Sequence, residues 1–179
     1  SIENNLSESE IHSGLYVYTI AIDLDQIGYE EKEYSHKKED NGNITVEYNE
    51  IDLEIDERCD RVLNILEAVE FLSRDIRGRR EDLSPLMMIG GVYDTKNPIF
   101  LNSIISDDKG NILVDPILES IPRESIGKTR IGIKNGLCRN LTRDLFEGSK
   151  TISKTFEDIR NDVINYYKDP SILRRDENE

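Results

Sequence analysis

Two short basic segments carry the side chains best suited to chemistry in this sequence, and that chemistry is phosphate binding. Residues 74–80 have a net charge of +3 because four arginines outnumber one acid. These arginines are Arg74, Arg77, Arg79 and Arg80. A guanidinium group stays charged and donates two parallel hydrogen bonds, which suits a phosphate group. A solvated helix end paired with nearby acids explains the same residues equally well, so both interpretations stay open.

The second basic segment, residues 123–143, has a net charge of +5. Within it, Thr129–Lys134 alternates between apolar and polar side chains, which predicts a strand with Ile131 and Ile133 in the core and a basic face outward. We expect this segment to supply a second set of phosphate contacts: Lys128, Arg130 and Lys134.

Glycines in the sequence do not form a nucleotide-binding loop. Gly127-Lys128-Thr129 ends like a phosphate-binding loop, but Pro122 occupies the place of the first glycine and the following residues alternate as a strand rather than opening a helix. Gly90-Gly91 is interpreted as a bulge or a close backbone approach in a central strand. Neither motif predicts a nucleotide site.

Acidic pairs raise the possibility of metal-assisted hydrolysis. Asp23 and Asp25 would lie on one face of a strand, but no third ligand is evident. Other acidic groups, Asp107/Asp108 and Asp52/Glu54/Asp56, are the neighbours expected by chance among 37 acids.

The remaining candidates for catalysis are few. His12 and His36 are the only imidazoles, and Cys59 and Cys138 lie far from them in sequence. We therefore predict no metal, no cofactor and no catalytic residue, and two free thiols rather than a disulfide.

The elements that would position the basic segments follow from apolar spacing. Residues 13–28 predict a long strand, and an acidic stretch, residues 29–57, predicts a variable insertion with at most a hairpin around Ile44–Tyr48. Residues 56–74 predict an amphipathic helix with Asp56 as its N-cap and Gly78 as a stop just beyond its end. The arginine cluster would then start in its last turn and continue into a loop.

The second half of the chain predicts more strands and one helix. Residues 86–93 indicate a central strand, residues 99–121 a hairpin around a turn at 107–111, and Phe156–Tyr167 a helix that ends near Pro170. This order is typical of an α+β sandwich of the ferredoxin or RRM type. We predict one domain over residues 1–179, with a frayed tail at 170–179.

Composition adds limits to this interpretation. The chain has 179 residues, a net charge of −14 and 36% hydrophobic residues. Its longest apolar stretches fall far short of the ~20 residues that cross a bilayer, so we expect no membrane association and a cytoplasmic location. The net charge by itself argues against nucleic acid. Outside the two basic segments the charge is −22, so the charges are segregated.

Three motifs in order resemble one protein family. Residues 61–72 followed by Arg77-Gly78-Arg79-Arg80, the earlier His12–Thr19 with Ile22-Asp23-Leu24, and Gly90–Asp94 are similar to motifs of the DevR-type CRISPR-associated proteins, members of the RAMP superfamily and the seventh Cas family. Those proteins supply the repeated backbone subunit of type I Cascade, and the resemblance is to the type I-B form.

The resemblance implies an RRM-like palm with an inserted acidic finger-like region. It also implies a non-catalytic subunit whose partners are CRISPR RNA, target DNA through the guide, other copies of itself and other Cascade subunits. Family members begin with an additional strand that nothing here matches, so we expect a fragment lacking the N-terminal strand. Two alternatives stay open: an acidic protein-interaction or regulatory module, and a metal-dependent RNA-cleaving relative from the same superfamily.

Overall fold

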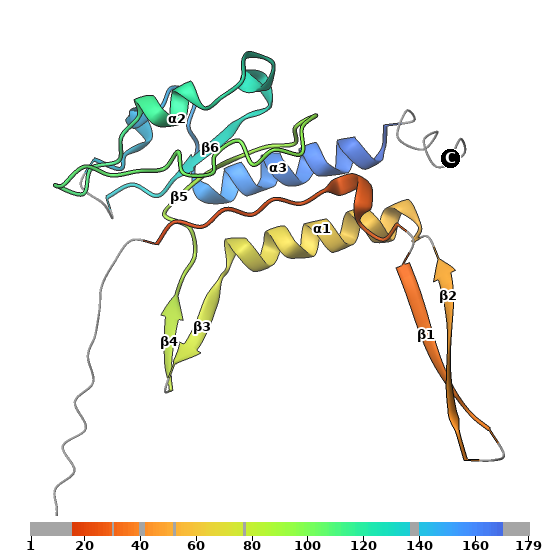
Figure 1. The fold of residues 1–179 in the computed structure, drawn as a ribbon. Helices are drawn as coiled ribbons and strands as arrows, with labels where there is room; N and C mark the ends of the chain where they lie inside the picture. Colours follow the sequence, from red (N-terminus) through yellow and green to blue (C-terminus); the bar gives the residue numbers. More distant parts are fainter. Residues whose placement is uncertain are drawn as a thin grey trace, which may run out of the picture.

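The computed structural model describes residues 16–29, 31–39, 42–51, 53–76, 78–136 and 140–169. Its two long helices are α1 (Ile55–Glu70) and α3 (Ile152–Tyr167), which pack against each other. Strands β5 (Met87–Gly90) and β6 (Arg130–Ile133) form an antiparallel sheet on α3. Figure 1 shows this sheet and α3 on one side and α1 on the other. The fold is α+β, as predicted.

Helix α3 forms where the spacing of apolar residues predicts it. Its inward face buries Phe156, Ile159, Val163 and Tyr167. Thr151 caps the first turn, because its hydroxyl accepts a hydrogen bond from the backbone N–H of Lys154 at 3.3 Å. The helix therefore presents one apolar stripe to the rest of the molecule.

Helix α1 is also confirmed, with different ends. It begins at Ile55 and has Glu54 rather than Asp56 at the N-cap, without a side-chain hydrogen bond. Asp56 and Glu57 instead lie in the first turn, where their negative charges interact favourably with the helix dipole and stabilise the helix. Val62 is fully buried and contacts the cluster that Val163 and Tyr167 form on α3.

Two hairpins extend from opposite ends of α1 (Figure 1). Strands β1 (Glu31–Lys38) and β2 (Ile44–Ile51) form the first, inside the predicted insertion. Strands β3 (Ser73–Ile76) and β4 (Arg79–Asp82) form the second, where we predicted a helix end and a loop. Gly78 lies at this second turn with a φ of +78°, a conformation that glycine adopts without strain. Arg74, Arg79 and Arg80 of the first basic segment therefore lie on a hairpin.

The N-terminal segment departs from its prediction. Residues 16–23 form no strand with other described residues, and Leu24–Gln26 is a short 3₁₀ turn. A β-strand is stabilised by hydrogen bonds to a neighbouring strand, and the alternation of side chains in the sequence does not show whether such a neighbour exists. Residues 13–15 lie outside the described residues.

The predicted hairpin over 99–121 is reduced to its turn. Asp107–Asn111 forms the turn and Ser106 bridges Ile112, but α2 (Asp115–Glu119) then follows as a helix. Pro116 near its start favours a helical first turn over a strand. A second core cluster lies here, formed by Ile117, Ile133, Leu141 and Phe146.

The remaining short elements are 3₁₀ turns at Arg123–Lys128 and Arg143–Leu145. Gly91 makes the close approach that we predicted for the glycine pair, because an added Cβ would lie 2.2 Å from the carbonyl oxygen of Lys128. No helix among the described residues combines the length and apolar character needed to cross a bilayer.

Candidate nucleic-acid interface

An open groove of about 800 Å³ lies where the β3–β4 hairpin, the end of β6 and the start of α3 meet. Three cationic side chains from different parts of the chain line it: Arg80, Lys134 and Arg143. Arg80 and Lys134 belong to the two separate basic segments of the sequence. The fold therefore brings part of each predicted set to one surface.

Local hydrogen bonds position the side chain of Arg80 and the backbone of Lys134 and Arg143. Arg80 donates from Nη2 to the hydroxyl of Ser73 across the hairpin, at 3.1 Å. The backbone N–H of Lys134 donates to the carbonyl oxygen of Leu86 at 2.9 Å. The backbone N–H of Arg143 donates to Oδ1 of Asn135 at 2.8 Å, which ties the 140s loop to the residues after β6.

The groove has a positive balance of side-chain charge. Among the described residues, no carboxylate forms an ion pair with Arg80, Lys134 or Arg143. Glu70 also lines the groove, but its buried carboxylate is paired with Arg160 at 2.5 Å. A phosphate entering the groove would therefore meet cations that form no ion pair with a carboxylate among the described residues.

Asp82 is the other acid that lines the groove. Hydrogen bonds from Ser84 hold the pKa of Asp82 below its usual range, and the charges of Lys134 and Arg80 act in the same direction. Its oxygen Oδ1 accepts from the backbone N–H of Ser84 at 2.9 Å. This carboxylate stays ionised at neutral pH and offsets one of the three cations.

The first turn of α3 completes the lining through Thr151, Ile152 and Ser153. A 16-residue helix carries a partial positive charge at its N-terminus, where backbone N–H groups lack helical partners. The helix dipole therefore adds to the positive potential of the three side chains.

Two of the other predicted contacts, Arg74 and Lys128, are paired with carboxylates. Arg74 lies on β3 and pairs with Glu81 of β4 at 3.2 Å. Lys128 pairs with Asp94. Arg77 lies outside the described residues, and only the backbone of Arg79 is described, within β4.

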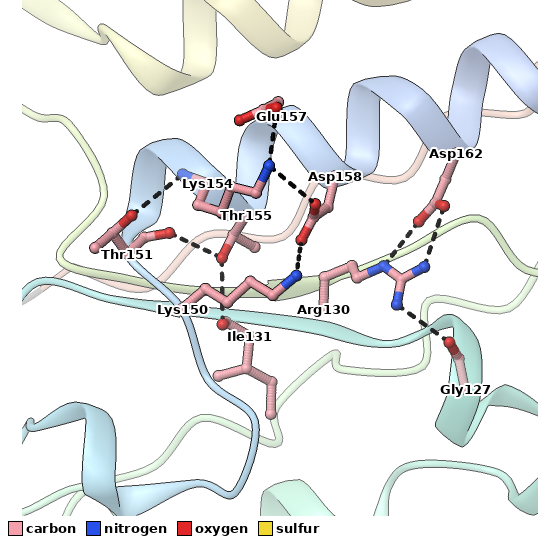
Figure 2. A network of polar contacts seen from close by, with 10 residues as sticks. All are labelled: Gly127, Arg130, Ile131, Lys150, Thr151, Lys154, Thr155, Glu157, Asp158 and Asp162. Carbon is pink, nitrogen blue, oxygen red and sulfur yellow. Dashed lines mark hydrogen bonds and ion pairs between the residues drawn. The ribbon is translucent and has the colours of Figure 1, made fainter.

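Arg130 departs most from its expected position, as Figure 2 shows. We predicted an outward basic face, but its guanidinium turns to α3 and donates to both carboxylate oxygens of Asp162, at 2.9 and 3.1 Å. This ion pair raises the pKa of Arg130. Beside it, Lys150, which bridges Gly132 of β6, pairs with Asp158 at 2.5 Å, so β6 and the segment beside it are each joined to α3 by an ion pair.

Sequence reasoning missed one lining cation. Arg143 belongs to the basic segment that we counted, but it follows no alternating pattern and begins a 3₁₀ turn. Its position in the same segment as Lys134 was the only signal. Its contact with Asn135, just after β6, depends on the folding of the intervening loop and could not be predicted from the sequence.

The candidate catalytic carboxylates have structural partners instead. Asp23 pairs with Lys96 at 2.7 Å. Asp25 accepts a hydrogen bond from the hydroxyl of Tyr166. Within the ranges that the structure describes, no three His, Cys, Asp or Glu side chains are grouped closely enough to hold a metal ion. Cys59 is a free, half-buried thiol, and burial raises its pKa.

One comparison with known proteins identifies a relationship. Residues 3–111 match the family model described as CRISPR-associated negative auto-regulator DevR/Csa2. Neither the curated proteins nor the solved structures include a match to the chain. The matched residues include Arg80 and end before Lys134 and Arg143.

Proposed function

The family model covers more than half of this chain, which therefore belongs to the DevR/Csa2 family of CRISPR-associated proteins, and on that premise we propose that it is a non-catalytic RNA-binding backbone subunit of a type I Cascade-like complex. Copies of it would assemble along a CRISPR RNA in the cytoplasm. Together with other Cascade subunits they would present the guide for pairing with target DNA.

The observation that carries this proposal is the groove lined by Arg80, Lys134 and Arg143. A backbone subunit must hold RNA without reading its sequence, because base pairing with the target supplies specificity. Contacts with phosphates from arginine and lysine side chains meet that need. An open groove lined by cations without ion-pair partners can accept an extended backbone.

We propose that the remaining predicted contacts contribute less to RNA binding than the three cations that line the groove. Arg77 and Arg79 belong to the same hairpin as Arg80 and would extend the surface along it. Arg74, Lys128 and Arg130 would each exchange a carboxylate partner for a phosphate, which lowers their net contribution. We expect them to affect RNA binding less than the three lining cations.

The test replaces Arg80, Lys134 and Arg143 together by alanine. Each lost phosphate contact on single-stranded RNA lowers the slope of log affinity against log salt by about 0.7, so we expect a weaker and flatter dependence. The readout is fluorescence anisotropy of a labelled single-stranded RNA at several salt concentrations. A matched control replaces three exposed cations outside the groove, Lys109, Arg123 and Lys168, and removes the same charge.

The result separates a local site from a general charge effect. If the control variant loses as much affinity and slope as the groove variant, the groove is not the RNA site. If neither the wild-type chain nor its assembly binds RNA, the RNA-binding function is wrong. An acidic regulatory or protein-interaction module, which the family's description as a negative auto-regulator also admits, would then be favoured.

The metal-dependent alternative has its own outcome. Incubation of the assembly with complementary RNA and Mg²⁺ would show cleavage if the chain were a ribonuclease. Cleavage that disappears in Asp23→Ala would favour the enzyme over the binding subunit. We expect intact RNA with both the wild type and Asp23→Ala, because Asp23 belongs to no group of three possible metal ligands among the described residues.

A further inference from the structure

An exposed aromatic ring lies in the groove lined by Arg80, Lys134 and Arg143, which we name the basic groove. The chain has four phenylalanines, and three of them are buried or half-buried. Phe71 is the exception: it is 66% exposed and lines the basic groove. It belongs to neither of the two core clusters. Packing of the core therefore does not explain an aromatic side chain at this position.

The backbone fixes Phe71 beside the hairpin that carries Arg80. Phe71 is the C-cap of α1, and its N–H donates back into the last turn of the helix. The carbonyl oxygen of the next residue, Leu72, accepts a hydrogen bond from the N–H of Leu83 at 2.8 Å, which closes the base of the β3–β4 hairpin. Arg80 donates to the hydroxyl of Ser73, two residues after Phe71. The ring and this guanidinium are therefore held on adjoining parts of one surface.

Apolar side chains form part of the same groove. Besides Phe71, they are Pro85, Ile133 and Ile152. A phosphate group is strongly hydrated and gains nothing from an apolar surface, whereas a nucleobase has a flat face that stacks on aromatic rings. The basic groove thus offers cations suited to the backbone of a nucleic acid and an aromatic ring suited to a base.

This combination is typical of proteins that bind single strands. Their cations follow the sugar-phosphate backbone while aromatic side chains stack on the bases, and any base is accepted because each has a π face. Stacking occupies the face of a base and leaves its Watson–Crick edge open. Such a contact suits a subunit that presents a guide for pairing.

We propose that Phe71 is a base-stacking platform, so that the basic groove binds a single RNA strand with its phosphates on the three cations and one base on the Phe71 ring. The inference rests on the proposed function, because both use the same groove, and it adds the form of the ligand. A duplex is excluded as the preferred ligand, since its bases are already stacked on one another.

The first test removes the ring and leaves the charges in place. Its probes are a labelled oligo(A) RNA and an abasic strand of the same length, which has the phosphates without the bases. Phe71→Ala should weaken oligo(A) binding about 5- to 100-fold. The slope of log affinity against log salt should stay unchanged, because no phosphate contact is lost. Binding of the abasic strand should equal that of the wild type.

Two further variants separate stacking from a general loss of an aromatic side chain. Phe71→Tyr keeps an aromatic ring and should bind oligo(A) like the wild type. Tyr34→Ala is the matched control, since Tyr34 is 61% exposed and lies outside the basic groove. We expect this control to bind both probes with unchanged affinity.

Fluorescence can report the stacked base directly, because the chain contains no tryptophan. Phe71→Trp introduces a single indole into the basic groove. Oligo(A) should quench its emission, and the abasic strand should leave the emission unchanged. Tyr34→Trp provides the matched indole outside the groove, and neither probe should quench it.

The outcomes distinguish this inference from the proposed function. The inference is overturned if Phe71→Ala binds oligo(A) like the wild type, if it loses as much affinity for the abasic strand, or if both indoles are quenched equally. In each of these cases the variant lacking the three cations would still show its weaker salt dependence, and the RNA-binding function would stand. A wild type that binds neither probe would overturn both. Circular dichroism verifies that each variant is folded.

Discussion

At the scale of single residues, the partner of each cation decides what it can bind. Arg130 is paired with Asp162, 32 positions away in the sequence, and Lys128 is paired with Asp94, 34 positions away. Lys134 and Arg143 have no such pair among the described residues and face an open groove. An arginine or lysine that is already paired must lose one attraction to gain another, which reduces its net gain from a phosphate. Whether a carboxylate lies within ion-pair distance therefore separates the basic residues suited to bind phosphate from those that join parts of the fold.

Tyr167 provides a prediction about pH at this scale. Its buried hydroxyl donates to the carbonyl oxygen of Leu24 at 2.9 Å, and burial raises the pKa of Tyr167 to about 12. The unfolded chain loses the same proton near its ordinary pKa of 10.0. Stability from this group is therefore complete below about pH 10 and is lost as the pH rises toward about 12.

The variant Tyr167→Phe measures that effect. It should lower the free energy of unfolding by about 1 kcal/mol at neutral pH, because the carbonyl of Leu24 loses its donor. Urea unfolding at neutral pH and near pH 11 should show a smaller loss of stability with pH in the variant than in wild type. Equal losses would show that Tyr167 does not carry the alkaline dependence.

At the scale of elements, close backbone contacts hold the sheet and its connections together. Gly91 follows β5 and packs on the carbonyl of Lys128, just before β6. The ion pair of Arg130 with Asp162 and the buried Thr155, whose hydroxyl donates to the carbonyl of Ile131 at 3.2 Å, fix β6 on α3. The start of α3 and the end of β6 are thereby brought to the same basic groove.

Two glycine variants test this packing. Gly91→Ala would place a Cβ 2.2 Å from a backbone oxygen, so the two segments must move apart. We expect a loss of about 1–3 kcal/mol in unfolding free energy. Gly127→Ala is the matched control because no heavy atom lies within 4 Å of its added Cβ. Equal urea midpoints for the two variants would contradict the close approach.

Helices that show as a pattern of neighbouring residues could be predicted from the sequence. Strands that depend on pairing with a distant segment could not. The apolar stripes of α1 and α3 predicted both helices, whereas the acidic stretch that contains the first hairpin was predicted only to hold at most a hairpin. The charged strands β3 and β4 have no apolar alternation to reveal them. Residues 16–23 have a strand's composition, but no described ladder includes them. The basic groove brings together Arg80, Lys134 and Arg143, which are far apart in the sequence. The sequence therefore showed that these residues are basic, but not that they lie on one surface.

At the scale of the whole molecule, segregated charge supports the proposal that an acidic chain binds RNA through one surface. The net charge of −14 conceals a groove where three cations face solvent together. Repulsion from the acidic remainder acts over about 10 Å at moderate salt, so binding depends on contacts made inside the groove. Assembly of many copies would add such contacts in series, and avidity would exceed the affinity of one copy.

The most direct test of the central claim locates RNA on the protein. Photocrosslinking of RNA to the assembled protein, followed by mass spectrometry, identifies the peptides in contact. The account predicts crosslinks in the peptides around Arg80, Lys134 and Arg143, all of which line the basic groove. Crosslinks confined to other surfaces, with none in these three peptides, would contradict it.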